Sequence, residues 1–332
     1  MEYIARMANV SKATVSRVVN GKKDGVSEET RRRVQQLIEE YEYTPNLVAR
    51  SMATARTKTI GVVIPDIENP FFPELVGSVE RHLRGWGYTV MLCNTAPSSS
   101  LEAQGIRTLL AKQVDGIILI SAQRQSKAGG QGVGKYGVPC VLLDRKNDSI
   151  DYNAGVFVDN ERAFREAAEL LLSHRNRRIA FIRGPAHFYT SQERFRGYLN
   201  ALKKHGIALD ESLLVSGNFS YQSGYRAVTT LYERKTEFTA LIACNDMMAF
   251  GAMRALQDRG VSVPEQVEVV GCDNVQFCEM VDPPLTTVAQ PTDEIGRRAA
   301  EVMVDLLAGG RAEKKDMWLE AHVVQRGSTR GQ

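Results

Sequence analysis

The sequence predicts an α/β protein in which a small, all-helical N-terminal segment precedes a large region of parallel sheets wound with helices. From Thr59 onward, short apolar runs alternate with helical patterns, as is typical of parallel sheets. The runs include TIGVVIP, YTVMLCN, VDGIILIS, VPCVLLD, RRIAFIRG, TALIAC and VEVVGCD. Seven or more strands over about 270 residues exceed a typical single core, so we expect two lobes.

Composition narrows the class of protein. Of the 332 residues, 43% are hydrophobic and 24% are charged, as in ordinary globular proteins. No run of about 18 apolar residues is present, and the first residues lack the apolar core of a signal peptide, so no membrane partner is expected. The five Cys lack C-x-x-C spacing and the five His lack metal-ligand spacing, which favours reduced, buried cysteines and no metal or cofactor.

The positive charge of the chain is concentrated at its N-terminus. Residues 1–59 contain 11 Lys and Arg against 7 Asp and Glu, whereas the rest of the chain contains 31 against 32, from totals of 42 and 39. The net charge of +3 therefore belongs to the small N-terminal segment. A polyanion is the partner that this distribution favours.

The stretch Ile4–Gly21 has the pattern of two short helices joined by a tight turn. Asn9 lies at the turn and tolerates a left-handed conformation, and Ser11 is a good N-cap for the second helix. The residues of that helix that face a core are Val15, Val18 and Val19. The opposite face carries Lys12, Ala13, Thr14, Ser16 and Arg17. Such a face fits the major groove of DNA, although an ordinary solvated helix has the same pattern.

A third helix is predicted to begin after Ser27, an N-cap followed by two Glu residues that suit the positive end of a helix. Its apolar stripe consists of Val34, Leu37, Ile38 and Tyr41. The next segment, Asn46–Thr54, is also helix-like but is too short to be stable in isolation.

Four motifs carry a family resemblance: VSKATVSRVVNG, VSEETRRRV, YTPNLVARSM and TKTIGVVIPDIENPFF. Their order and spacing resemble those of the LacI/GalR family of bacterial transcription regulators, over essentially the whole chain. The resemblance implies a helix-turn-helix DNA-binding headpiece (1–45), a hinge helix and linker (46–58), and an effector-binding and dimerisation domain (59–332). Family members usually begin a few residues earlier, so the headpiece is expected to be truncated before its first helix cap.

The resemblance also implies DNA contacts, with the second helix in the major groove and the hinge helix against the minor groove. The matching positions are Ser11, Lys12, Ala13, Thr14, Ser16, Arg17, Asn20, Asn46, Ala49, Arg50 and Met52. The family commonly has Leu as a wedge at the central base step, and Met52 stands there in this chain; Met is apolar and flexible and can still wedge. The implied partner is double-stranded operator DNA, and the implied location is cytoplasmic and nucleoid-associated.

The larger region carries candidate ligand-binding residues where its strands end, because ligands of wound parallel sheets bind beyond the carboxyl ends of the strands. These residues are Asn69, Phe71, Phe72, Asp144, Arg145, Arg194, Phe219, Asn245, Asp273 and Gln290. Phe rings pack on the C–H faces of a sugar, while carboxylate, amide and guanidinium groups bind hydroxyls in pairs. The set therefore suits a small polyol.

Taken singly, several of these residues have structural alternatives. Asp144 could form a lone ion pair at a strand end, and Asp246 is expected to be a helix N-cap rather than a site residue. The stretch IENPFF places Phe71 and Phe72 in a Pro-containing loop after the first strand, from which both rings cannot enter the same core. Either ring alone could be a core residue.

By resemblance, the whole larger region is similar to the type I periplasmic-binding-protein fold, with lobes over 59–158 plus 290–320 and over 159–289. The ten strand-end residues match positions where ribose binders of this fold contact their ligand, and RGPAH…QERFRGY resembles the ribose-operon repressors of Gram-positive bacteria. The implied effector is D-ribose, acting as inducer between the lobes. Phe71 and Phe72 would then form an apolar face for the sugar ring.

Other functions differ in the sequence features that they require. The added headpiece and the missing signal peptide argue against a periplasmic sugar receptor, and the sequence has no nucleophile–base pair, P-loop or metal cluster typical of an enzyme. A purine-responsive regulator remains an alternative, as does another sugar. Control by a serine-phosphorylated phosphocarrier protein as co-repressor would need a basic patch on the first lobe, for which Arg81 and Arg84 are weak candidates.

A homodimer is expected, because one headpiece reads only a few base pairs and two-fold DNA sites match two-fold proteins. The last residues, VVQRGSTRGQ, contain no heptad repeat, so a tetramer held by a C-terminal coiled coil is not expected.

Overall fold

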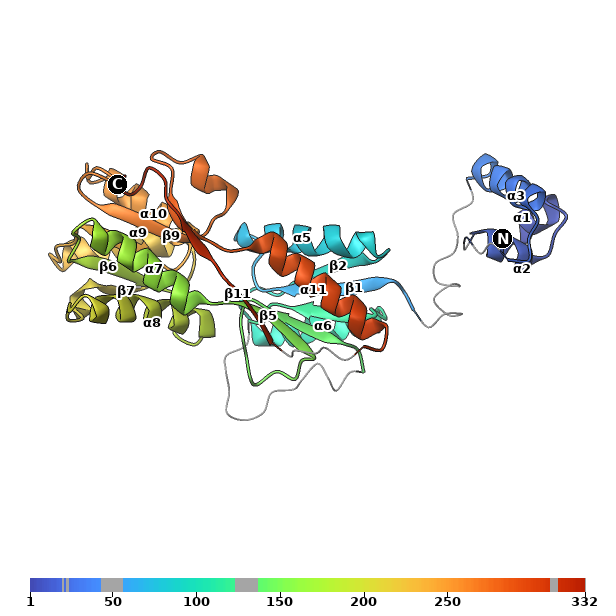
Figure 1. Ribbon diagram of the computed structural model, residues 1–332, viewed down its shortest axis with the longest axis horizontal. Helices are drawn as coiled ribbons and strands as arrows, with labels where there is room; N and C mark the ends of the chain where they lie inside the picture. The colour runs from blue at the N-terminus through green and yellow to red at the C-terminus, as the bar shows by residue number, and fades with distance from the viewer. Residues whose placement is uncertain (20, 22–23, 43–55, 123–136, 311–315, 332) are drawn as a thin grey trace. The chain divides into compact units, whose positions relative to one another are not determined.

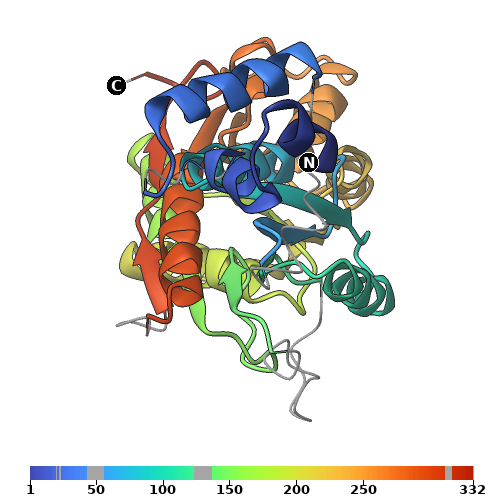
Figure 2. The ribbon, with the colours of Figure 1, turned by 90° about the vertical axis from the view of Figure 1, so that its right-hand side faces the viewer.

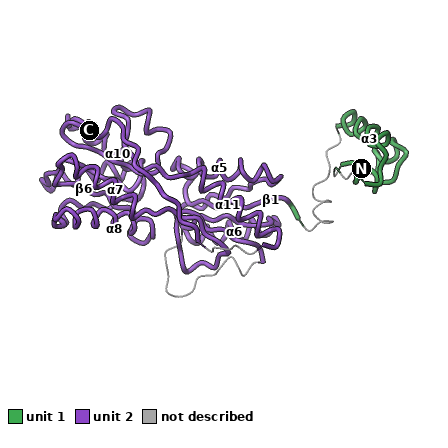
Figure 3. Tube along the Cα trace, viewed as in Figure 1, with its two compact units in different colours: residues 1–57 green, residues 58–332 purple. Residues whose placement is uncertain are grey.

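The computed structural model describes two compact units. They comprise Met1–Thr57 and Lys58–Gln332 and are coloured separately in Figure 3. The structure describes the whole chain except residues 20, 22–23, 43–55, 123–136, 311–315 and 332.

The first unit is a bundle of three helices (Figures 1 and 2), namely α1 (Glu2–Met7), α2 (Lys12–Val19) and α3 (Glu28–Glu40). Its core consists of Ile4, Ala5, Ala8, Val15, Val18 and Val34. The turn after α1 contains Asn9 at φ 52°, in the left-handed region that Asn tolerates. Ser11 Oγ accepts a hydrogen bond from Thr14 N at 3.1 Å, and Ser27 caps α3 in the same way. The expected caps, turn and valine face are therefore confirmed.

One member of the predicted apolar stripe lies elsewhere. Tyr41 follows the last turn of α3, is 40% exposed, and packs edge-on against Tyr3 with ring centroids 5.2 Å apart. Its stripe neighbours Leu37 and Ile38 do pack on the core. Tyr41 contacts Tyr3 of α1 on the outside of the bundle. It follows the last residue of α3 and therefore does not continue the inward-facing stripe of that helix.

The first lobe of the second unit contains a six-stranded parallel sheet in the order β11-β5-β4-β3-β1-β2. Its strands are β1 (Thr59–Ile64), β2 (Thr89–Asn94), β3 (Gly116–Leu119), β4 (Cys140–Leu143), β5 (Ala154–Val158) and β11 (Asp316–Leu319). Helices α5 (Phe71–Gly85) and α11 (Thr292–Leu307) cover one face side by side, and α6 (Ser99–Ala111) covers the other (Figure 1). Because both faces are covered, β1, β3 and β4 appear in the sequence as continuous apolar runs.

The second lobe contains another six-stranded sheet in the order β12-β10-β9-β8-β6-β7, parallel except for β12. Its strands are β6 (Ile179–Arg183), β7 (Leu214–Ser216), β8 (Ala240–Ala243), β9 (Glu268–Asp273), β10 (Thr286–Ala289) and β12 (His322–Val324). Its helices are α7 (Asn160–Ser173), α8 (Tyr189–Lys204), α9 (Tyr221–Glu233) and α10 (Asp246–Gln257), with two 3₁₀ turns, Glu211–Leu213 and Gln276–Glu279. The predicted α/β class with two parallel-sheet lobes is confirmed.

Helices α9 and α10 approach closely because each presents a glycine to the other. A Cβ atom on Gly224 would lie 2.0 Å from the carbonyl oxygen of Met248, and one on Gly251 would lie 2.0 Å from that of Tyr221. No other residue fits at either position without moving the backbone of the opposite helix.

Three crossovers connect the lobes. The chain passes from β5 into α7, from β10 into α11, and from β11 into β12. The last of these adds a strand to the second lobe, a segment that the sequence left unassigned. Each lobe is therefore assembled from segments that lie far apart in the chain, and its strands end facing the other lobe.

Candidate effector-binding site

A small chamber between the two lobes contains every ligand-binding residue proposed from the sequence. Its lining residues are Asn69, Phe71, Phe72, Asp144, Arg145, Thr190, Arg194, Phe219, Asn245, Asp273 and Gln290. Only Thr190 was not among the ten proposed. The chamber has a volume of about 20 Å³, room for roughly one water molecule. A larger chamber of about 490 Å³ adjoins it and shares Asn69, Phe72, Arg145 and Phe219.

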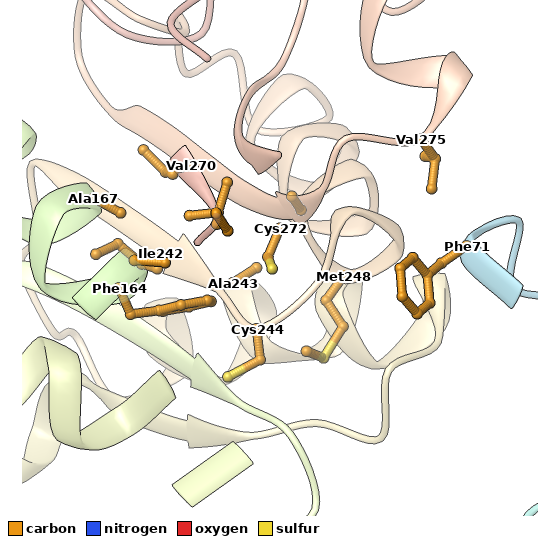
Figure 4. Close-up of a cluster of buried hydrophobic side chains, with 14 of the residues drawn as sticks. Phe71, Phe164, Ala167, Ile242, Ala243, Cys244, Met248, Val270, Cys272 and Val275 are labelled. Atoms are coloured by element: carbon orange, nitrogen blue, oxygen red, sulfur yellow. The ribbon is translucent and has the colours of Figure 1, made fainter. Parts of the chain in front are cut away.

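The apolar wall comes from Phe71 and Phe72. Both residues begin α5 rather than lying in a loop, and Asn69 Oδ1 accepts a hydrogen bond from Phe71 N at 3.2 Å just before the helix. The rings meet edge to face at 5.3 Å and are 2% and 3% exposed. Phe71 extends toward Met248 and Val275 of the second lobe (Figure 4). The expectation that both rings cannot enter the same core is wrong, because Phe71 and Phe72 belong to one buried apolar cluster, and both also line the chamber.

Arg145 separates the small chamber from the large one. Its guanidinium carbon lies 4.0 Å from the ring centroid of Phe188, 5.5 Å from that of Phe72 and 5.7 Å from that of Phe219. Burial lowers the pKa of this guanidinium, while Asp144 opposes that effect. Asp144 has φ 59° and holds Oδ2 3.6 Å from Arg145 Nε. Within the described part of the chain, neither Asp144 Oδ1 nor Arg145 Nε has a hydrogen-bond partner.

The second lobe contributes a buried pair of ionisable side chains, Arg194 and Asp273. Arg194 NH2 lies 3.8 Å from Asp273 Oδ1, and Gln290 Nε2 donates to the same oxygen at 2.8 Å. Asp273 ends β9 at φ 122°, a strained conformation for a residue with a side chain. Burial raises the pKa of this carboxyl, and the nearby Arg194 charge offsets only part of the increase. Gln290 Oε1 is buried without a partner among the described residues.

Arg194 is held in place from behind the chamber. Its Nε donates to Asn160 Oδ1 at 2.7 Å, and its NH1 donates to the carbonyl oxygen of Cys244. Burial alone would lower the pKa of Arg194, but the surrounding acidic groups, Asp273 among them, raise it. The side chain is therefore a fixed, permanently charged donor at the chamber wall.

Asn245 has two roles. It is the N-cap of α10, where its Oδ1 accepts from Met248 N at 3.1 Å, and its Nδ2 donates to the Phe219 carbonyl at 3.0 Å. The expectation that Asp246 caps this helix is wrong. The Asp246 carboxylate is instead completely buried and accepts from Thr287 Oγ1 at 2.6 Å and from Val275 N at 3.0 Å. It fixes the structure behind the chamber rather than the helix end.

The proposed DNA-contacting residues fall into two groups. Ser11 lies just before α2 and is exposed, as are Lys12, Ala13 and Arg17 on the helix, whereas Thr14 and Ser16 are half-buried. The remaining five candidates lie outside the described residues, namely Asn20, Asn46, Ala49, Arg50 and Met52.

One contact of the α2 face proposed to bind DNA was not predicted from the sequence. Lys12 Nζ forms an exposed ion pair with Glu2 Oε1 at 2.8 Å, and the hydrogen bond from Lys12 lowers the pKa of Glu2. An acidic group thus stands beside a basic side chain proposed to contact DNA.

The arginines proposed as a weak basic patch on the first lobe are neutralised. Arg81 pairs with Asp293 at 3.0 Å, and Arg84 pairs with Glu80 one turn away. On the adjacent α11, two further arginines are paired with carboxylates in the same way, namely Arg297 and Arg298 with Glu294 and Glu301. The described part of this face offers little uncompensated positive charge.

The described residues contain no group of three or more His, Cys, Asp or Glu that could hold a metal ion. None of the described helices is long and apolar enough to cross a membrane.

A three-helix headpiece joined to a two-lobed domain with a polar chamber between the lobes defines a ligand-responsive regulator of transcription. The model for bacterial regulatory proteins of the lacI family matches residues 1–46, and the model for periplasmic binding proteins and the sugar-binding domain of the LacI family matches residues 57–326. The chain belongs to the LacI family. It is a DNA-binding transcriptional repressor with a sugar-binding domain.

Relatives of this chain differ in function. It is 35% identical to the catabolite control protein A of Priestia megaterium, with 98% of each chain covered. It is 32% identical to the ribose operon repressor of Haemophilus influenzae, covering 99% of this chain and 98% of the relative. Among solved structures, the lac repressor dimer bound to operator and an anti-inducer superposes with a TM-score of 0.86 at 26% identity, covering 99% and 98% of the two chains. Overall similarity therefore establishes the family but not the effector.

Proposed function

We propose that this repressor binds D-ribose in the chamber between its lobes and that binding releases it from operator DNA. The observation that carries the proposal is the set of buried polar atoms without partners around an aromatic wall, Asp144 Oδ1, Arg145 Nε and Gln290 Oε1. Buried polar groups are almost always hydrogen-bonded, so such a cluster favours a polar ligand that supplies the missing bonds. The hydroxyls of a small sugar can both donate and accept.

Binding requires the chamber to enlarge. A pentose is several times larger than a water molecule, and the chamber has room for roughly one. Arg145, stacked on Phe188 of the opposite lobe, is the side chain that must shift for a sugar to enter. The ligand then contacts both lobes, and it changes their preferred arrangement by its differential affinity for the two states.

The effect on DNA follows from the connection of the lobes to the hinge. A repressor dimer holds two headpieces on a near-palindromic site, so the lobe arrangement sets the separation of the two hinge segments. The hinge helix proposed from the sequence is too short to remain helical alone, so a change of spacing would melt it. A sugar that is consumed should relieve repression, which favours an inducer. As a bacterial regulator of transcription, the protein would act in the cytoplasm.

Two alternatives predict different responses. A purine is flat and has few hydroxyls, and it would not use Asp144, Arg145, Arg194 and Asp273 together. Control by a phosphoprotein would need free positive charge on the first lobe, where Arg81 and Arg84 are paired with carboxylates.

The test has two stages. Selection from random DNA first identifies an operator, and calorimetry then measures affinity for pentoses, hexoses, purines and ribose phosphates. Fluorescence anisotropy of the operator is recorded with and without millimolar D-ribose, and separately with the serine-phosphorylated phosphocarrier protein. We expect ribose to lower operator affinity. A response to a purine, a hexose or the phosphoprotein but not to ribose would reject the proposal.

A further inference from the structure

The first crossover between the lobes is very short. Strand β5 ends at Val158 and helix α7 begins at Asn160, so Asp159 alone separates a strand of one lobe from a helix of the other. Asp159 N donates to the carbonyl oxygen of Leu319 at 2.9 Å, which joins this crossover to the third one. A change in the angle between the lobes must therefore be absorbed by the few backbone torsions around Asp159.

Asn160 links this crossover to the chamber. Its side-chain Nδ2 donates to the Val158 carbonyl at 3.1 Å, and its Oδ1 accepts from Arg194 Nε at 2.7 Å. The side chain is 2% exposed and does not line the chamber itself. The Asn160 amide thus bridges Val158, the last residue of β5, and Arg194, the arginine that lines the chamber.

The amide makes the two bonds with two different atoms. The bond to Val158 needs a donor, and the bond to Arg194 needs an acceptor. Arg194 has a second anchor, the Cys244 carbonyl, which is independent of Asn160. Removing the donor of Asn160 would therefore release the crossover while leaving Arg194 in place.

We infer that Asn160 is a positioning residue that couples effector binding at Arg194 to the angle between the lobes. The inference rests on the proposed function, since it requires a ligand at Arg194. A ligand that draws Arg194 toward the chamber shifts its bond to Asn160, and Asn160 transmits that shift to the Val158 carbonyl. Coupling between two binding sites needs such a physical link with two arrangements.

The test separates binding from coupling. Asn160→Asp retains the acceptor for Arg194 and loses the donor to Val158. A control, Asn200→Asp, adds the same charge on α8, where Asn200 is exposed and donates to Glu161, the residue after Asn160, so it reports the effect of a negative charge near the crossover by itself. For each protein, calorimetry gives the ribose affinity, and anisotropy gives the ratio of operator affinities without and with saturating ribose. Allosteric coupling of ordinary strength would make this ratio of operator affinities about 5–150 in the unaltered protein.

We expect Asn160→Asp to bring the ratio close to one while ribose affinity changes less than about tenfold, with Asn200→Asp unchanged in both. A variant that keeps the ratio overturns the inference. So does one that loses ribose affinity but keeps the full ratio at saturation, because Asn160 would then only support binding. If Asn160→Asp does not fold, Asn160→Ser is measured, and the same loss of ratio is expected with weaker ribose binding. An unaltered protein that ignores ribose rejects the proposed function, and the inference with it.

Discussion

Replacing Asp273 by Asn tests the chamber without altering its shape. Asn has the same shape as Asp and meets the same strain at φ 122°, and its side-chain oxygen can still accept from Gln290 Nε2. What is lost is the carboxylate that two sugar hydroxyls would share. Hydrogen bonds to charged groups contribute about 1.5 kcal/mol or more each. Ionising a carboxyl of pKa about 8 at pH 7 costs about 1.4 kcal/mol and offsets part of this gain. The variant should therefore bind ribose more weakly by about 1.6 kcal/mol, or more than about tenfold in Kd.

The stability of the ligand-free protein should increase at neutral pH. Burial raises the pKa of Asp273 to about 8, so its neutral form prevails in the folded protein at pH 7, and a neutral amide resembles it. A carboxyl whose pKa is raised by folding destabilises the protein as pH increases from its unfolded pKa of about 4 to its folded one. Asp273→Asn should remove this decline between about pH 4 and 8. Its free energy of unfolding should match that of the unaltered protein near pH 4 and exceed it at pH 7 by up to about 4 kcal/mol, at about 1.36 kcal/mol per pH unit.

Proton release provides an independent readout. Sugar hydroxyls that donate to the Asp273 carboxylate favour its ionised form, so binding should lower its pKa and release a proton at pH 7. Ribose affinity should then increase with pH until about pH 8, and the calorimetric enthalpy should depend on the ionisation enthalpy of the buffer. The Asn variant should lose both dependences. If it bound ribose within threefold of the unaltered protein, or if the unaltered protein released no proton, the assigned role of Asp273 would be wrong.

Four further outcomes are expected. Arg17→Ala should cost about 1–3 kcal/mol of operator affinity and relax base preference at one position per half-site, and an unchanged consensus after selection from random DNA would contradict this. Met52→Ala should weaken operator binding and reduce DNA bending without affecting ribose affinity, as measured by anisotropy and gel mobility; an unchanged bend would remove Met52 from the interface. Gly224→Ala should destabilise the second unit by about 1–3 kcal/mol in urea, because its Cβ meets the Met248 carbonyl, whereas Gly77→Ala has open space and serves as the control. Sedimentation should show a homodimer, and a stable tetramer or monomer at micromolar concentration would count against it.

Sequence patterns located most of the fold because buried parallel strands are long apolar runs. β1, β3, β4, β8 and β9 all lie within such runs. Shorter or less apolar strands such as β7, β11 and β12 gave no comparable signal, since they lie at or near sheet edges and alternate with exposed positions. Their pairing depends on tertiary context, which local patterns do not contain.

The chamber residues were accessible to sequence reasoning because they follow strands, where wound sheets bind ligands. Thr190 and Phe188 were missed because they lie at the start of a helix, one loop beyond the strand end. Asn160 was missed because its role depends on two partners, Val158 and Arg194, of which one is distant in the chain. The error at Asp246 has a similar cause. Asn and Asp are equally good N-caps, and only the buried bond to Thr287 distinguishes the two neighbours.

The interleaving of the lobes has a consequence for biosynthesis. Both sheets gain their last strand from residues 316–324, where β11 pairs with β5 and β12 pairs with β10. While the ribosome is still translating this region, β5 and β10 each have an unpaired edge, and neither lobe can close as an independent nascent domain. A premature stop codon shortly before β11 would therefore leave both lobes incomplete at once. The headpiece, in contrast, has all three of its helices within the first unit and can fold as soon as that segment emerges.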